Sequence, residues 1–262
     1  MSQSKLLNKK IIISAAANGI GWSIAQECMS NGAIVYITDK NNESLKKISK
    51  HKLHEKQLFL DKVNSENFKE VENYFNKIKN KVDSIDALIN NVGIAGPTGK
   101  LEELNINDWK ETLDININSH FYFTKFSIPL LKNNNGGSII NLSSTAGLFG
   151  FPLRSPYATS KWAIIGMTKT LAMELGENNI RVNAICPGAV AGDRMKRVIK
   201  AKAQSLGVKE ESLQKDYESM VSLKSFVDKK DIANMVVFLL SEEAQKISGQ
   251  VMSVDGNTER MN

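Results

Sequence analysis

Short runs of β-branched and other apolar residues recur along the chain, and in the segments between them apolar residues are spaced three and four apart. The runs predict buried strands of a parallel sheet at residues 10–14, 33–38, 57–60, 84–90, 137–142, 181–185 and 250–254. The spaced segments predict amphipathic helices at about 22–29, 40–53, 65–80, 108–132, 155–176 and 231–240. Because strands and helices alternate throughout, we expect a single α/β domain over residues 1–262, a doubly wound parallel sheet.

One long segment, residues 191–228, is polar and lacks the pattern of the core elements. It contains two helix-forming stretches, 195–205 and 211–220, and it follows the carboxyl end of the predicted strand 181–185. Ligands bind at that edge of such sheets, and most connections are shorter. We therefore expect this insert to act as a substrate lid.

A turn of small residues follows the first strand, where positions 14–21 read Ser-Ala-Ala-Ala-Asn-Gly-Ile-Gly. Small residues at a strand-to-helix turn let backbone N–H groups approach a pyrophosphate at the positive end of the helix. The second strand ends at Asp39, eighteen residues after Gly21. A carboxylate there accepts hydrogen bonds from ribose hydroxyls and repels a 2′-phosphate, which favours NAD over NADP. The alternative is a tight turn that packs helix on strand and binds no ligand.

Tyr157 and Lys161 stand four apart on the helix predicted from residue 155, so their Cβ atoms lie roughly 5–6 Å apart. An ammonium that close stabilises a phenolate and lowers the tyrosine pKa from its usual value of about 10. Tyr157 is therefore a candidate general acid/base for an alcohol or carbonyl oxygen, with Ser144 as a second hydrogen-bond partner. Taken alone, a tyrosine and a lysine at this spacing also occur by chance.

Composition restricts the class of protein. Of the 262 residues, 42% are hydrophobic and 24% are charged, which suits one full-sized α/β domain. No run approaches the eighteen apolar residues of a membrane span, and residues 1–10 lack an apolar signal core, so we expect a cytoplasmic protein without a membrane partner. The net charge of +6 is scattered along the chain, which argues against nucleic acid while still attracting anionic cofactors and substrates.

No metal site or disulfide is expected. Cys28 and Cys186 are far apart in sequence and lack CxxC spacing. His51, His54 and His120 form no ligand motif, and the first two lie in a lysine-rich stretch typical of a solvated surface.

Taken in order, these motifs resemble those of the short-chain dehydrogenase/reductase family from about residue 9 to residue 256. The family's TGxxxGxG turn corresponds to residues 14–21, its NNAG to 90–93, its YxxxK to Tyr157 and Lys161, and its PG to 187–188. Its catalytic serine corresponds to Ser144, thirteen residues before Tyr157, and its catalytic asparagine to Asn116.

The resemblance implies a Rossmann-type fold and a role for each matching residue. Tyr157 would exchange the proton with the substrate oxygen held by Ser144. Lys161 would bind the nicotinamide ribose and lower the Tyr157 pKa, and Asn116 would anchor a water in the proton relay. Besides Tyr157 and Lys161, the cofactor contacts implied are Ser14, Asn18, Gly19, Ile20, Gly21, Asp39, Asp61, Val63, Asn91, Gly93, Pro187, Gly188 and Val190.

Three departures from the family pattern affect cofactor contacts. Ser14-Ala15 replaces Thr-Gly, and the added methyl is expected to crowd the turn and shift cofactor affinity modestly. Val92 replaces the usual alanine. Gly192 stands where a threonine commonly contacts the nicotinamide carboxamide, and Asp193 or a backbone group is the candidate substitute.

The sequence therefore predicts an NAD-dependent oxidoreductase acting on a secondary alcohol or ketone, such as a small polyol, sugar or hydroxy acid. A 3-oxoacyl-carrier-protein reductase is the alternative enzyme, although Asp39 argues against the NADPH that such enzymes usually prefer. A non-catalytic NAD-binding sensor or scaffold is the alternative from another class. Arg154 and Arg194 flank the predicted cleft, either as a grip for an anionic substrate or as ordinary surface arginines. The resemblance also suggests a homotetramer.

Overall fold

The computed structural model describes residues 4–50 and 56–260, and its centre is a seven-stranded sheet in which all pairs are parallel. The strand order is β3-β2-β1-β4-β5-β6-β7. The strands are β1 Lys10–Ile13, β2 Ile34–Asp39, β3 Leu58–Lys62, β4 Ala87–Asn90, β5 Gly137–Leu142, β6 Ile180–Pro187 and β7 Val251–Val254. The predicted doubly wound parallel sheet is confirmed, with strand ends shifted by a few residues.

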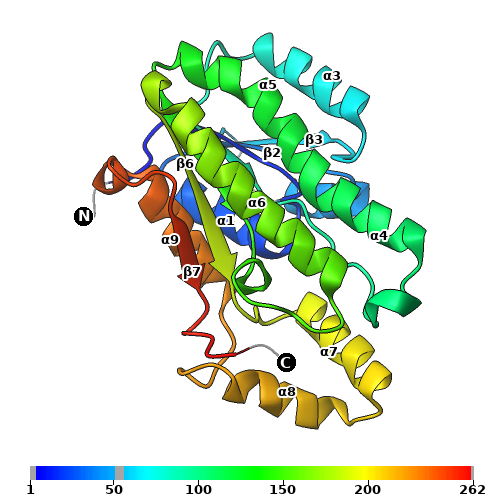
Figure 1. Ribbon diagram of the computed structural model, residues 1–262. Coiled ribbons are helices and arrows are strands. Elements are labelled where there is room, and N and C mark those ends of the chain that lie inside the picture. The colour runs from blue at the N-terminus through cyan, green and yellow to red at the C-terminus, as the bar shows by residue number, and fades with distance from the viewer. Residues whose placement is uncertain (1–3, 51–55, 261–262) are drawn as a thin grey trace.

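Helices cover both faces of this sheet (Figure 1). One face carries α1 Gly19–Ser30, α2 Asn42–Ile48 and α9 Lys229–Leu240. The other carries α3 Phe68–Lys79, α5 Ser119–Asn133 and α6 Ser155–Glu174, and α4 Ile106–Leu113 leads into α5. Because both faces are covered, successive strand residues enter opposite cores: Ile11 and Ile13 pack on the α1 side, and Ile12 packs on the α3 side. This accounts for the unbroken apolar runs in the sequence.

The strand order reverses between β1 and β4, because β2 and β3 continue in one direction and β5 to β7 in the other. A crevice forms at the carboxyl ends of the strands at such a point, where α/β sheets bind their ligands. The fold therefore places the turn after β1 and the segment after β4 side by side at the expected binding edge.

The prediction of one continuous helix over 108–132 was wrong in one respect. The helix is interrupted by a π-helical turn, Asp114–Asn118, between α4 and α5. Such turns are frequent at functional sites. This one contains Asn116, whose side-chain hydrogen bonds go to the segment after β4 rather than along its own helix.

The insert folds as α7 Asp193–Leu206 and α8 Glu210–Ser219, which lie beyond the carboxyl ends of the strands (Figure 1). The two helices share a small apolar core of their own, formed by Ile199, Ala203, Leu213 and Tyr217. The role of residues 191–228 as a substrate lid stays a prediction.

Part of the predicted helix 40–53, together with His51 and His54, lies outside the described residues. Among the helices that are described, none is both long and apolar enough to cross a bilayer.

Candidate active site

The turn after β1 is tied to the end of β4. The hydroxyl of Ser14 donates to Ile89 O at 3.4 Å and accepts from Asn91 N at 3.0 Å. At Gly21 the backbones approach so closely that an added Cβ would lie 2.5 Å from Asn91 Nδ2 and 2.7 Å from Ala16 Cα. Only glycine fits there, so the turn, α1 and β4 form one tightly packed unit.

The amino end of α1 is open. Gly19 has φ +59°, and a Cβ added to it would meet no atom within 4 Å. Asn18, the residue before the helix, makes no capping hydrogen bond with its side chain, and the first turn contains no acidic residue. The first amide groups of α1 therefore lack a cap from the Asn18 side chain, and there is open space beside Gly19, so this end of the helix fits a pyrophosphate. Ile20 and Gly21 complete this first turn.

Ala15 is held in the left-handed region, with φ +49°. Its carbonyl accepts a hydrogen bond from Asn91 Nδ2 at 2.8 Å, and the turn still leads into α1 at Gly19. The methyl group thus does not displace the turn; it adds backbone strain instead.

Asp39 ends β2 with its carboxylate beside this turn and only 7% exposed. One oxygen accepts from Ala17 N at 3.0 Å and the other from Asn41 N at 2.9 Å, which fixes the carboxylate and leaves acceptor capacity on both oxygens. In the neighbouring strand, Asp61 forms an ion pair with Lys77 of α3, and buried Val63 donates from its backbone N–H to Asp39 O at 3.0 Å.

Ser144, Tyr157 and Lys161 meet at the carboxyl end of β5. Ser144 is the second residue after that strand, and the other two lie in the first turns of α6, where Pro156 suits the helix start. The ammonium of Lys161 lies 5.7 Å from the centroid of the Tyr157 ring and donates to Leu142 O at 2.9 Å. Ser144 hydrogen-bonds the Tyr157 hydroxyl.

Asn116 ties the segment after β4 to α6. Its Oδ1 accepts from Ile94 N at 2.7 Å, and its Nδ2 donates to Ile94 O at 3.1 Å and to Ser160 Oγ at 2.9 Å. A Cβ at Gly93 would lie 3.3 Å from Lys161 Nζ and 3.4 Å from Asn116 Oδ1. The side chain of Asn116 is thus engaged by the protein itself and positions the surroundings of Lys161.

The charges around Tyr157 decide its acidity. Burial by itself raises the pKa of this phenol, but the net pKa lies below the usual value because Arg194, Lys161, the Ser144 hydrogen bond and Arg154 favour the phenolate. The guanidinium carbons of Arg154 and Arg194 lie 5.4 and 5.8 Å from the Tyr157 ring centroid. The sequence spacing predicted that Lys161 alone lowers the Tyr157 pKa. In the structure, Arg154 and Arg194 contribute to the same effect.

The segment after β6 borders the same crevice. Pro187 ends the strand, and Gly188 packs so closely on Asp255 that a Cβ would lie 2.8 Å from Asp255 Cβ. Val190 makes a bridge to Val227. Gly192 precedes α7 and has φ +138°. A threonine would be strained in this conformation, which explains why this chain has glycine at the position where the family commonly has threonine.

Four neighbours of the site were missed by sequence reasoning: Phe151, Lys202 and Tyr217, which surround Arg154, and His120. Lys202 lies on the apolar face of α7 beside Ile199 and Ala203, an irregularity of the pattern that could have singled it out. His120 is buried next to Lys161, with its Nε2 3.0 Å from Val92 O, and carried no motif.

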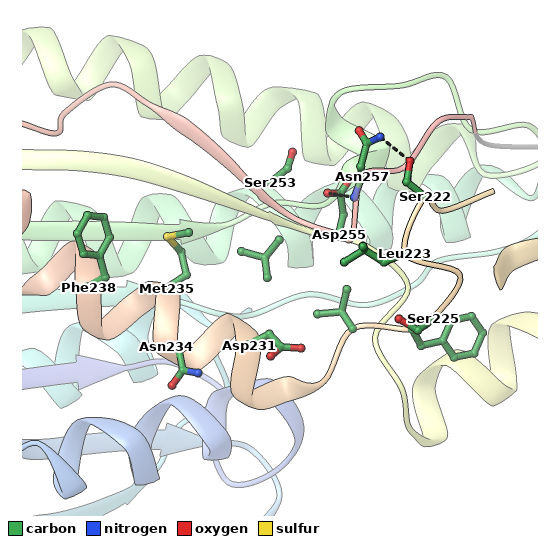
Figure 2. Close-up of a pocket in the computed structure, with 14 residues that line it drawn as sticks. Ser222, Leu223, Ser225, Asp231, Asn234, Met235, Phe238, Ser253, Asp255 and Asn257 are labelled. Carbon is green, nitrogen blue, oxygen red and sulfur yellow. Dashed lines mark hydrogen bonds between the residues drawn. The ribbon is translucent and has the colours of Figure 1, made fainter. Parts of the chain in front are cut away.

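A separate groove of about 810 Å³ lies between α9, residues 222–227 and the carboxyl end of β7 (Figure 2). Met235, Phe238 and Val254 give it apolar walls, and Asn257 Nδ2 donates to Ser222 Oγ at 2.6 Å near its rim. None of the four predicted catalytic residues lines it. Cys28 and Cys186 are buried free thiols, and no cluster of three potential metal ligands occurs in the parts of the chain that the structure describes.

Comparison with known proteins places this geometry in context. The family model described as enoyl-(acyl carrier protein) reductase matches residues 15–257. The chain is similar to a short-chain dehydrogenase/reductase of Botryotinia fuckeliana, with 33% identity over 98% of both chains. It is also similar to the 3-oxoacyl-[acyl-carrier-protein] reductase of Aquifex aeolicus, with 32% identity over 96% of this chain and 98% of the relative. A solved structure of NAD⁺-bound xylitol dehydrogenase superposes with a TM-score of 0.91 at 26% identity, covering 96% of this chain and 99% of that one.

Proposed function

Because this chain belongs to the short-chain dehydrogenase/reductase family and is an oxidoreductase acting on CH–OH groups, we propose that it uses NAD in preference to NADP to interconvert a secondary alcohol and its ketone. The observation that carries the proposal is the phenol of Tyr157, hydrogen-bonded by Ser144 and flanked by Lys161 and Arg194. The substrate type we propose is a small polyol, sugar or hydroxy acid.

The residues of this chain provide positioning and proton transfer. In the direction of alcohol oxidation, the phenolate of Tyr157 takes the hydroxyl proton of the substrate while Ser144 holds the same oxygen. Lys161 stabilises the phenolate and would hold the nicotinamide ribose, and Asn116 fixes the neighbouring segment. The open end of α1 at Asn18–Ile20 would hold the pyrophosphate. When bound, NAD supplies the hydride acceptor. The main contribution of the protein is to place the nicotinamide and the substrate correctly relative to each other.

Proton transfer is tested by the substitution Tyr157→Phe in a spectrophotometric assay of alcohol-dependent NAD reduction. We expect kcat to fall by about 10²- to 10⁴-fold, because general acid–base catalysis contributes about that much. The Kd for NAD should change little, and Tyr122→Phe on α5 serves as a matched control. Full turnover by Tyr157→Phe would refute the assigned chemistry.

The preference for NAD rests on Asp39, whose carboxylate is fixed beside the turn by two backbone amides. The family resemblance supports the other proposed cofactor contacts, which are those of Ser14, Asp61, Val63, Asn91, Gly93, Pro187, Gly188 and Val190. For Asp61 and Ser14, the side-chain groups are already engaged within the protein, by Lys77 and by β4 respectively.

A second candidate is a 3-oxoacyl-carrier-protein reductase, which the similarity to the Aquifex aeolicus enzyme favours. Rates with acetoacetyl thioesters and NADPH, compared with small polyols and hydroxy acids with NAD, separate the two candidates.

We also propose a homotetramer. Its support in this chain is a stripe of exposed apolar side chains, with Trp162 and Met173 on one face of α6 at 52% and 85% exposure, and Phe121 on the adjoining α5 at 48%. Exposed apolar patches of this kind favour association. Light scattering tests the assembly: a monomeric mass excludes it, and Trp162→Glu is expected to dissociate it. The cytoplasmic location predicted from the sequence is tested by cell fractionation.

A further inference from the structure

Arg154 is almost completely buried in the loop that precedes α6, with 2% of its surface exposed. Its Nη2 donates to Ala95 O, while its Nε is buried without a hydrogen-bond partner. The guanidinium carbon lies 5.5 Å from the Phe151 ring centroid and 5.4 Å from that of Tyr157. A charged donor is thus placed against the proposed general acid/base with part of its bonding capacity unused.

A second buried cation comes from the insert. Lys202 on α7 is also 2% exposed, and its ammonium lies 5.3 Å from the Phe151 ring centroid and 5.4 Å from that of Tyr217 on α8. The Phe151 ring therefore contacts both cations. The hydroxyl of Tyr217 is buried and, within the described chain, has no partner.

Buried cations are normally compensated by an anion, because removing a charge from water is costly. Among the described residues, the groups with the largest electrostatic effect on the pKa of Arg154 are Tyr157, Tyr217 and Arg194, and none of them is a carboxylate. Arg154 forms no ion pair among residues 4–50 and 56–260. Burial, followed by the charge of Arg154, lowers the pKa of Lys202, so the two cations lie close enough to repel each other.

We propose that Arg154 grips the carboxylate of the substrate, with the Tyr217 hydroxyl and Lys202 beside it, so that the enzyme acts on a short hydroxy acid or the corresponding oxo acid. A planar guanidinium matches a planar carboxylate, and the free Nε provides a donor for it. Because Arg154 lies against the Tyr157 ring, the carboxylate is separated from the reacting carbon by only a few bonds.

This inference rests on the proposed function of Tyr157. In the oxidation, the carbinol C–H and O–H bonds break and a C=O bond forms. The hydride reduces NAD⁺ to NADH, and the proton passes to Tyr157 Oη. The carboxylate takes no part in the electron balance; it fixes which carbon lies beside the phenol.

The test uses 2-, 3-, 4- and 5-hydroxyhexanoate, each beside its methyl ester, with NAD and the 262-residue chain. The wild-type enzyme is expected to oxidise the 2- or 3-hydroxy acid with a kcat/KM at least about 30-fold above that of its ester, because leaving a buried charge unpaired costs about 2 kcal/mol or more. Arg154→Met and Lys202→Met should each lower the ratio of kcat/KM for the acid to that for the ester, because an effect of Arg154 on the Tyr157 pKa changes both substrates alike and cancels in this ratio. Arg154→Lys should restore part of the loss, and Lys200→Met, an exposed neighbour on α7, should behave as wild type.

Folding of each variant is checked by circular dichroism and by the Kd for NAD. Equal turnover of acid and ester by the wild type would overturn the carboxylate grip and leave the proposed function intact. A loss of NAD affinity in Arg154→Met and Lys202→Met, with an unchanged KM, would assign the cations to the cofactor phosphates instead. No oxidation of any alcohol would refute the proposed function and the substrate class together. If Arg154→Met does not fold, Lys202→Met and Arg154→Lys decide the question.

Discussion

The guanidinium carbon of Arg194 lies 5.8 Å from the centroid of the Tyr157 ring, as near as the Lys161 ammonium at 5.7 Å. Arg194 comes from the insert, on α7, and donates to Gly93 O at 3.1 Å. The acidity of the phenol therefore depends on a segment outside the sheet and its covering helices. If the insert moves when ligands enter, the proton-transfer group is tuned by the same motion.

Replacing Arg194 by methionine is expected to raise the pKa of Tyr157, because a cation that favours the phenolate is lost. Alcohol oxidation requires the phenolate, so the acid limb of the pH–rate profile should move to higher pH, with a smaller change of rate at high pH. The measurement is kcat against pH at saturating NAD. Lys196→Met, which removes an exposed charge from the same helix, is the control, and an identical shift in both variants would show a general charge effect only.

Asp39→Ser should relax the discrimination between the two cofactors. The carboxylate that repels a 2′-phosphate is removed, while the serine hydroxyl can still accept from a backbone amide. We expect the ratio of kcat/KM for NAD to that for NADP to fall by at least about tenfold, equivalent to about 1.4 kcal/mol. An unchanged ratio would show that Asp39 does not control cofactor choice. Asp61→Ser is the comparison variant, since that carboxylate is paired with Lys77.

Ala15→Gly should stabilise the protein by about 1 kcal/mol. Alanine at φ +49° bears a left-handed penalty of about 1–2 kcal/mol, and only part of it is offset by the greater freedom of glycine in the unfolded chain. Denaturant unfolding measures the change. Ala16→Gly is the matched control: Ala16 is fully buried and is not among the described residues with positive φ, so its loss should destabilise. A decrease in stability for Ala15→Gly would contradict the strain.

His120 should make the protein acid-sensitive. Burial, together with Lys161, lowers its pKa from 6.5 to about 3, so the imidazole stays neutral in the fold while the unfolded chain binds a proton below pH 6.5. Stability is therefore lost as pH falls from about 6.5 toward 3, by up to about 1.4 kcal/mol per pH unit.

The glutamine variant His120→Gln removes this proton linkage. Its free energy of unfolding, measured by urea denaturation between pH 7 and pH 4, should depend less on pH than that of the wild type. Ser119→Ala changes a buried, non-titrating neighbour and should lower stability by the same amount at each pH. Parallel curves for wild type and His120→Gln would show that the histidine binds its proton at the same pH in the native and unfolded states, and would contradict the lowered pKa.

The sequence pattern predicted the strands because each buried parallel strand must be apolar on both faces, a property of the local residues alone. The i, i+4 spacing of Tyr157 and Lys161 likewise fixes their common helix face wherever that helix packs. The interruption of the helix at Asn116 was not predicted because it depends on the hydrogen bonds between Asn116 and Ile94. These two residues are far apart in the sequence, and only the fold brings them together.

What the sequence determined by itself was the alternation of elements and the doubly wound sheet, together with the motifs from which the cofactor-binding and catalytic residues are proposed. Only the tertiary structure decided which charges surround Tyr157. Arg154, from a loop, and Arg194, from the inserted helix, converge on Tyr157, and nothing in their local spacing predicts this. Periodicity reports the face of an element on which a residue lies; burial and charge compensation depend on what the rest of the chain places against that face.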